Sequence, residues 1–299
     1  MVRTVSVIKW ARRRWLRVAS ALAVLAVALG ALGWWSSRFP AESESIGRPP
    51  FQVAVQRGVP PHEVANVRVG LTAIDDYLRS DVGVGVGVDG PVQVRVSWSN
   101  GCRLFLGPQS VSTAWVDGDD FICLNAAHRR WRSSTEGHDY FPAYVAAHEH
   151  VHNLQAQLGR FNGEGDHEWQ WLFEGMASEL AYRALVKAGV MTAADVGLAI
   201  WEYRALQDDN GTLADYERSS EGAGNNYGLF HLGARAAARA AGSPKSFVSF
   251  CRATASGAAW KQAFQDAFGM PVEDFYDVVE AERTKLRAGT DLTTGKPRG

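Results

Sequence analysis

The chain has 299 residues and a formal charge of -1, with 46% hydrophobic and 21% charged residues. This length fits one large domain or two small ones, and the composition is that of a protein with a globular core. Acidic and basic residues nearly balance, and the long basic run is confined to the first 20 residues. The charge pattern therefore gives no indication of a basic surface that would bind nucleic acid.

The N-terminus differs in character from the rest of the chain. Residues 1–17 form a basic flank without acids, and residues 18–35 are uncharged and mainly apolar. This order is typical of an export or membrane-anchor signal, and a helix over 18–35 would span about 27 Å, close to a bilayer core. Arg12 and Arg13 also resemble the pair of a twin-arginine export signal. We expect the flank in the cytoplasm and the rest outside, either anchored by a transmembrane helix or exported after signal cleavage.

An extracytoplasmic location bears on the three cysteines. Cys102 and Cys123 can form a disulfide in an oxidising compartment, and two small buried thiols are the alternative. Cys251 lies in a helical pattern and is expected to be a buried helix residue.

The folded part is predicted to begin after a linker. Residues 36–60 are rich in Ser, Pro and Glu, which is typical of a linker, and 61–289 then form the domain. Apolar residues at helical spacing predict a helix over 61–80. The alternating Val-Gly run that follows, 82–90, favours a flexible connection over a strand. The tail, 290–299, is expected to be flexible.

Short strands precede a series of helices. Alternation predicts a strand over 91–99 and two short strands around an Asp-Gly-Asp-Asp turn within 114–125. Helical patterns then run to the end of the domain, over 141–158, 167–189, 192–207, 225–242, 243–256, 258–269 and 272–289. Gly189, Gly242 and Gly269 fall where helix C-caps belong. The fold class is therefore α+β, with a small mixed sheet N-terminal to a mainly helical bundle.

One short stretch carries metal-binding chemistry. Residues 148–152 read HEHVH and fit the pattern H-E-x-x-H. On a helix, His148 and His152 lie about 40° apart around the helix axis, so both can bind one ion. Glu149 lies beside them and can contact a water molecule bound to that ion. His150 lies about 200° from His148 around the helix axis, so it faces away and is excluded as a ligand. An exposed histidine-rich helix face is the alternative.

A second stretch, WLFEGMASEL at 171–180, supplies a further ligand. It places Glu174 about twenty residues after His152, at the start of another predicted helix. Zinc in hydrolases takes three protein ligands and keeps a fourth position for water, so a carboxylate here completes the two histidines.

Together, AAHEHVH and WLFEGMA resemble the gluzincin peptidases, the thermolysin and aminopeptidase-like group of zinc proteases, and most closely the small peptidase MA-like domains. That family's pattern is H-E-x-x-H, a spacer of about twenty residues, then W-L-x-E-G-x-A. The resemblance covers about 60 to 285, strongly over 145–180 and loosely elsewhere. It implies a zincin-like fold that binds Zn2+ and hydrolyses peptide bonds with a zinc-activated water. The implied zinc ligands are His148, His152 and Glu174, with Glu149 as general base.

The resemblance also implies a tyrosine that donates to the tetrahedral intermediate. Tyr227 is the candidate, with a core tyrosine as the alternative, and Tyr203 and Tyr216 are weaker candidates. His231 lies one turn from Tyr227. The family's cleft is lined by an edge strand that pairs with extended substrate, and 120–128 fits it best.

Other metal patterns fit less well. Metzincins require Gly and His where this chain has Gln155 and Leu158. Asp166 could act as third ligand, as in aspzincins, but the Gly-Thr-x-Asp pattern of that family is missing, and His167 is a further competitor. The acidic turn at 117–120 lacks EF-hand spacing for calcium.

The sequence thus predicts a membrane-tethered or exported zinc peptidase whose partners are peptide or protein substrates and, through its N-terminal segment, the membrane. The G-x-M-E-N motif of aminopeptidases is missing, which favours an endopeptidase or an unassigned peptidase. The alternatives are a catalytically silent zinc-binding or scaffold module of the cell envelope, and a structural membrane protein that binds metal incidentally. An intact Glu149 argues against the silent module, because a pure zinc-binding module needs no base.

Overall fold

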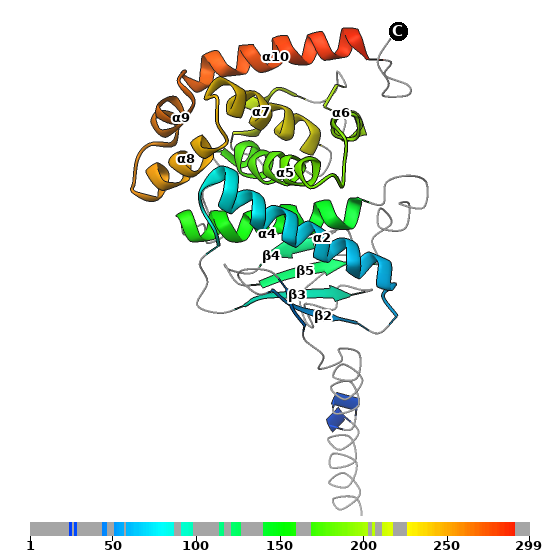
Figure 1. Ribbon diagram of the computed structural model, residues 1–299. Coiled ribbons are helices and arrows are strands. Elements are labelled where there is room, and N and C mark those ends of the chain that lie inside the picture. Colours follow the sequence, from blue (N-terminus) through cyan, green and yellow to red (C-terminus); the bar gives the residue numbers. More distant parts are fainter. Residues whose placement is uncertain are drawn as a thin grey trace, which may run out of the picture.

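The described part of the chain combines one mixed sheet with a larger set of helices (Figure 1). The computed structural model describes residues 24–25, 27–28, 44–46, 51–56, 58–86, 91–97, 114–116, 121–126, 140–159, 169–202, 205–206, 211–217 and 226–290. The predicted mixed sheet and mainly helical remainder are confirmed.

The sheet has five strands in the order β1-β2-β3-β5-β4. The three inner strands, β2, β3 and β5, run parallel, and the edge strands β1 and β4 are antiparallel to their neighbours. Their bounds are Glu44–Ile46, Phe51–Val55, Val92–Ser97, Ala114–Val116 and Phe121–Asn125 for β1 to β5. In β3 the predicted alternation holds, since Val92, Val94 and Val96 are fully buried.

Two predictions about strands need correction. Residues 36–60, predicted as a linker, contain β1 and β2. The prolines and serines around β2 hide an alternation in which Phe51 and Val53 are buried, and these residues pair with a strand far along the chain. The strand within 120–128 was predicted as an edge, but β5 lies between β3 and β4. The hairpin folds β4 onto the outer side of β5, so β4 is the edge strand.

The helices follow the predicted order. The first, α2 (Pro61–Tyr77), continues through the π-helical turn η1 (Leu78–Val82) and connects the parallel strands β2 and β3. The later elements are α4 (Phe141–Gly159), α5 (Gln170–Lys187), α6 (Ala193–Glu202), the 3-10 helix η4 (Leu213–Tyr216), α7 (Tyr227–Ala240), α8 (Lys245–Ala255), α9 (Trp260–Phe268) and α10 (Val272–Gly289). The three predicted C-cap glycines all have a positive φ, which matches the left-handed C-cap conformation.

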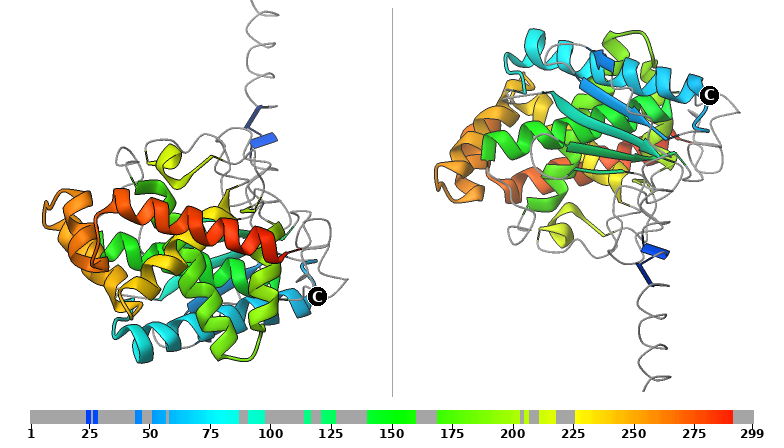
Figure 2. Two further views of the ribbon diagram at one scale, coloured as in Figure 1. Left: turned by 90° about the horizontal axis from the view of Figure 1, so that it is seen from above. Right: turned by 90° about the horizontal axis from the view of Figure 1, so that it is seen from below.

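These elements stack in layers. The sheet lies at one end, α2 and α4 come next, α5 and α7 follow, and α10 lies on the far side (Figure 1). Figure 2 shows the sheet beside α4 in the view from below and α10 across α7 in the view from above. The helix α4 is therefore enclosed between the sheet and α5, which makes it the most central helix of the described domain.

A close approach between α2 and α4 depends on one glycine. A Cβ added at Gly70 would lie 2.1 Å from the backbone oxygen of Ala143. Because backbone atoms cannot yield as a flexible side chain can, we expect Gly70→Ala to lower the free energy of unfolding by about 1–3 kcal/mol, as overpacking does. Gly197 in α6 has no atom within 4 Å of such a Cβ, so Gly197→Ala should be neutral or stabilising. Thermal unfolding of both variants tests this, and equal melting temperatures would contradict it.

The N-terminal segment is described only in part. Of the predicted span 18–35, residues 24–25 and 27–28 are helical, and Val24 and Val27 are 70% and 73% exposed. Within the described residues, no helix combines the length and the hydropathy needed to cross a bilayer.

The structure describes two of the three cysteines. Cys123 on β5 takes part in a disulfide and Cys251 is a free, buried thiol. The predicted partner, Cys102, lies outside the described residues.

Candidate metal centre

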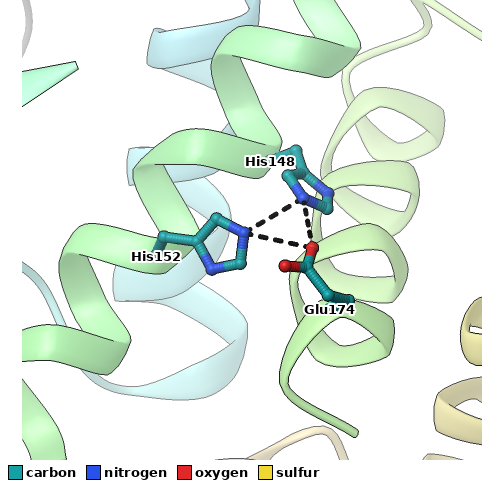
Figure 3. Close-up of side chains that lie close together, drawn as sticks. All are labelled: His148, His152 and Glu174. Atoms are coloured by element: carbon teal, nitrogen blue, oxygen red, sulfur yellow. Dashed lines mark hydrogen bonds and ion pairs between the residues drawn. The ribbon is translucent and has the colours of Figure 1, made fainter. Parts of the chain in front are cut away.

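The predicted ligands come together at the contact between α4 and α5. His148 and His152 project from the same side of α4, one turn apart, and Glu174 points at both from α5 (Figure 3). The sequence stretches that carry these residues lie on separate helices, so it is the packing of α4 against α5 that closes the site.

The three candidate ligand atoms form a small triangle. The two Nε2 atoms are 3.1 Å apart, and Oε2 of Glu174 lies 3.2 Å from Nε2 of His148 and 3.4 Å from Nε2 of His152. A tetrahedral zinc ion with bonds of about 2.0–2.1 Å separates neighbouring ligand atoms by roughly 3.3–3.4 Å. The triangle therefore has the size of one face of a zinc coordination sphere.

The imidazole of His152 is held in place by groups on the side of the ring that faces away from the centre. Its Nδ1 donates to Oε1 of Gln155 at 2.6 Å, and Nε2 of Gln155 donates in turn to the backbone oxygen of Phe173 at 2.8 Å. The ring of Phe173 also stacks on His152, with centroids 4.7 Å apart. Metal-binding histidines commonly use their second ring nitrogen in this way, which fixes the tautomer and directs the other nitrogen at the ion.

His148 and Glu174 have comparable support. Nδ1 of His148 lies 3.3 Å from the hydroxyl of Ser178 and 3.5 Å from that of Tyr144. Nε2 of Gln170 donates to Oε1 of Glu174 at 3.3 Å, which leaves Oε2 directed at the histidines. Sequence reasoning gave Gln155, Ser178, Tyr144 and Gln170 no supporting role, although each stands three or four residues from the ligand on its own helix.

Burial and charge set the protonation of the ligands. Burial lowers the pKa of both histidines, but in His152 the carboxylate of Glu174 outweighs this and raises the pKa to about 9. Burial raises the pKa of Glu174, yet the adjoining His152 and His148 bring it well below its usual range. At neutral pH the metal-free centre therefore holds a protonated His152 against an ionised Glu174.

This protonation state predicts pH-dependent zinc binding. Zinc must displace the proton of His152, because only the neutral imidazole binds metal. We expect the binding of zinc at neutral pH to release about one proton from His152, and affinity to rise with pH until it levels off near the pKa of about 9. Titration calorimetry in buffers of different ionisation enthalpy measures the released protons. An affinity that does not change between pH 6.5 and pH 9 would contradict this protonation state.

Glu149 stands next to the first ligand on α4 and is itself buried, with 8% of its surface exposed. Burial raises the pKa of Glu149 to about 7, the charge of Glu174 acts in the same direction, and His152 opposes both. A carboxyl group with such a pKa can take up and release a proton near neutral pH, as a general base must.

His150 faces away from the centre, as predicted. Its ring is fully buried and meets Phe51 of the sheet edge-on, with centroids 4.9 Å apart, and burial lowers its pKa to about 4. Because His148 and Glu149 are buried as well, the alternative of an exposed histidine-rich helix face is wrong.

The structure brings Tyr227 to the centre. Tyr227 is the first residue of α7, is half-buried, and its ring centroid lies 6.0 Å from that of His148.

The other candidate residues lie elsewhere. Tyr216 accepts a hydrogen bond from Nδ2 of Asn226 at 2.6 Å, and so supports the start of α7. His231 pairs with Glu179. The remaining candidates lie outside the described residues: Asp166, His167, Tyr203 and the turn 117–120.

Comparison with known proteins leaves the family open. The chain matches no protein-family model, and no curated protein matches it significantly. The gluzincin resemblance accordingly stays a prediction, and the proximity of the three candidate ligand atoms is what supports a metal centre.

Proposed function

We propose that this protein is a zinc-dependent peptidase of the gluzincin type, with His148, His152 and Glu174 as zinc ligands and Glu149 as general base. The observation that carries the proposal is the convergence of three ligand atoms on one point. The second ring nitrogen of each histidine and the second oxygen of the carboxylate already have hydrogen-bonding neighbours. Such pre-organisation is typical of a metal centre.

The donor set suits zinc in a hydrolase. Two imidazoles and one carboxylate match the ligands of catalytic zinc in peptidases and leave a fourth position open. A bound zinc ion would supply a Lewis acid there and lower the pKa of a water molecule in that position. A purely structural zinc site is instead usually closed by four protein ligands, two or more of them cysteines.

The residues around the ligands have distinct proposed roles. Glu149 accepts a proton from the attacking water and returns it to the leaving amine, and its place beside His148 on α4 supports this role. Tyr227 donates its hydroxyl proton as a hydrogen bond to the oxyanion that develops on the scissile carbonyl. A buried carboxyl group of this kind beside a metal centre supports the hydrolase over a catalytically silent zinc-binding module.

The proposed location is outside the cytoplasm. The disulfide of Cys123 supports an oxidising compartment, since disulfides seldom persist in the cytosol. The basic flank 1–17 and apolar segment 18–35 support export, with the segment either retained as an anchor or cleaved.

A peptide-library cleavage assay tests the activity. The full chain is incubated with a mixed peptide library as purified, after removal of metal by a chelator, and after zinc is added back. We expect cleavage that disappears with the chelator and returns with zinc. Cleavage that resists metal removal, or no cleavage of any peptide by a chain that holds zinc, would contradict the proposed activity.

A further inference from the structure

A second buried polar pair lies beside the metal centre and takes no part in holding the metal. Oε2 of Glu179 on α5 lies 2.9 Å from Nε2 of His231 on α7, and the two side chains are only 4% and 2% exposed. Glu179 follows the ligand Glu174 on α5, and His231 stands one turn after Tyr227 on α7. The pair thus joins the helix of a metal ligand to the helix of the proposed oxyanion donor.

Small apolar residues bring α5 and α7 close together beside this pair. A Cβ added at Gly175 would lie 2.3 Å from the backbone oxygen of Phe230 and 3.0 Å from the Cβ of Ala234. Small residues of this kind let two helices approach closely, but they have no polar side chain that could form a directional contact. A hydrogen-bonded pair is directional, so it can fix one register where a smooth apolar surface would allow several.

The carboxylate of Glu179 is held on both sides. Its Oε1 accepts from Nε of Arg183 at 2.5 Å, which leaves Oε2 for His231. Arg183 in turn is hydrogen-bonded to Tyr77 on α2. Glu179 is therefore connected through Arg183 to a third helix as well as to α7.

Contacts between aromatic rings connect the pair to the metal ligands. The ring of His231 lies 4.6 Å from that of Tyr182, and Tyr182 stacks on Tyr144 with centroids 4.4 Å apart. The hydroxyl of Tyr144 is 3.0 Å from that of Ser178, which supports Nδ1 of His148. The pair therefore lies in one network of ring contacts with the residues that orient His148.

We propose that Glu179 and His231 are positioning residues that set the register of α7 against α5 and so direct Tyr227 at the metal centre. Residues four apart on a helix lie about 40° apart, so His231 and Tyr227 share one side of α7. Fixing His231 to Glu179 therefore fixes the ring of Tyr227 beside His148. The kinetic consequence rests on the proposed peptidase function, whereas the geometric consequence does not.

A double-mutant cycle tests the kinetic consequence in the full chain. Tyr227→Phe should lower kcat by about 100-fold, the effect of removing one oxyanion donor. His231→Phe, which keeps a ring but loses the donor, should lower kcat at least tenfold with little change in KM or zinc content. His231→Gln, which can still donate to Glu179, should restore most of the activity. Because His231 acts through Tyr227, the double variant should be no slower than Tyr227→Phe alone.

A spectroscopic measurement tests the geometric consequence without any substrate. With 3-fluorotyrosine placed at position 227, the 19F resonance reports the surroundings of that ring. We expect His231→Phe to shift or broaden the resonance and His231→Gln to leave it near its wild-type position. The control is His62→Phe, which changes an exposed histidine on α2 and should leave resonance and kcat unchanged.

The outcomes separate this proposal from the proposed function. A wild-type protein that cleaves no peptide overturns the peptidase function, while the 19F measurement still decides the positioning role. An unchanged 19F resonance in His231→Phe, or losses in kcat that multiply in the double variant, would overturn the positioning role. Should His231→Phe fail to fold, Glu179→Met replaces it in both measurements, because it has a similar length and loses the acceptor of the same contact.

Discussion

Glu149→Gln should abolish most peptide hydrolysis while zinc and fold remain. The amide has nearly the volume of the carboxyl group and can occupy the same buried place on α4, but it cannot accept a proton from water at neutral pH. General base catalysis contributes about 10²–10⁴-fold to rate, so we expect kcat to fall by that factor. Steady-state kinetics with a peptide found in the library screen, together with metal analysis, measure both quantities.

Two comparisons sharpen the test of Glu149. Glu273→Gln changes a carboxylate on α10 whose side chain is 62% exposed, and should leave kcat unchanged. In the pH–rate profile of the wild type, kcat should fall at acidic pH as Glu149 becomes protonated. This acidic limb of the profile should disappear in Glu149→Gln. A bound cation lowers the pKa of Glu149, so the limb should lie below the value of about 7 that holds without metal. Full activity in Glu149→Gln would show that another group is the base.

Glu174→Ala should release zinc. The substitution removes the carboxylate oxygen that faces both histidines and leaves only two protein ligands. We expect zinc affinity to fall by more than about 100-fold, the upper range for loss of an outer hydrogen-bonding partner. Without Glu174 the pKa of His152 also falls, which eases proton competition and recovers a small part of the loss. Competition with a chromophoric chelator measures the affinity.

A second variant, with a smaller expected loss of zinc affinity, serves as a control for Glu174→Ala. Gln155→Leu leaves all three ligands in place but removes the acceptor for Nδ1 of His152 and the donor to the backbone oxygen of Phe173, so zinc affinity should fall by about 10- to 100-fold. The predicted order is therefore wild type, Gln155→Leu, then Glu174→Ala. Unchanged metal content in Glu174→Ala would mean that the third ligand is another residue, such as Asp166 or His167.

Much of the helical part could be predicted from local patterns. Apolar residues recur with helical spacing and glycines stand at the ends, so the expected helix over 272–289 coincides with α10, and 141–158 is α4 less its last residue. The helix expected over 192–207 is shorter, since α6 ends at Glu202. Glycine at a C-cap is a local signal that needs no tertiary partner, which is why those positions were found.

Strand pairing could not be predicted in this way. The β2 strand has only five residues among prolines, and its stability comes from β1 and β3 on either side of it. The order β3-β5-β4 likewise depends on contacts between segments far apart in the chain, and the residue pattern within β5 contains no information about this. The edge position of β4 was missed for that reason.

The ligands of the site were easier to predict than their support. His148 and His152 stand at a spacing that any helix brings to one side, and Glu174 followed from the resemblance of its surroundings. The hydroxyl of Ser178 reaches His148 only because α5 packs against α4 at one particular register. The pair of Glu179 and His231 depends in the same way on how α5 and α7 meet, and no spacing along the chain indicates it.

The most direct test of the account is the metal content of the purified full chain, measured by elemental analysis beside a His148→Ala/His152→Ala variant. We expect about one zinc ion per wild-type chain and none in the variant, with both proteins folded by circular dichroism. No zinc in the wild type after exposure to zinc, or equal zinc in both proteins, would contradict a metal centre at the contact of α4 and α5.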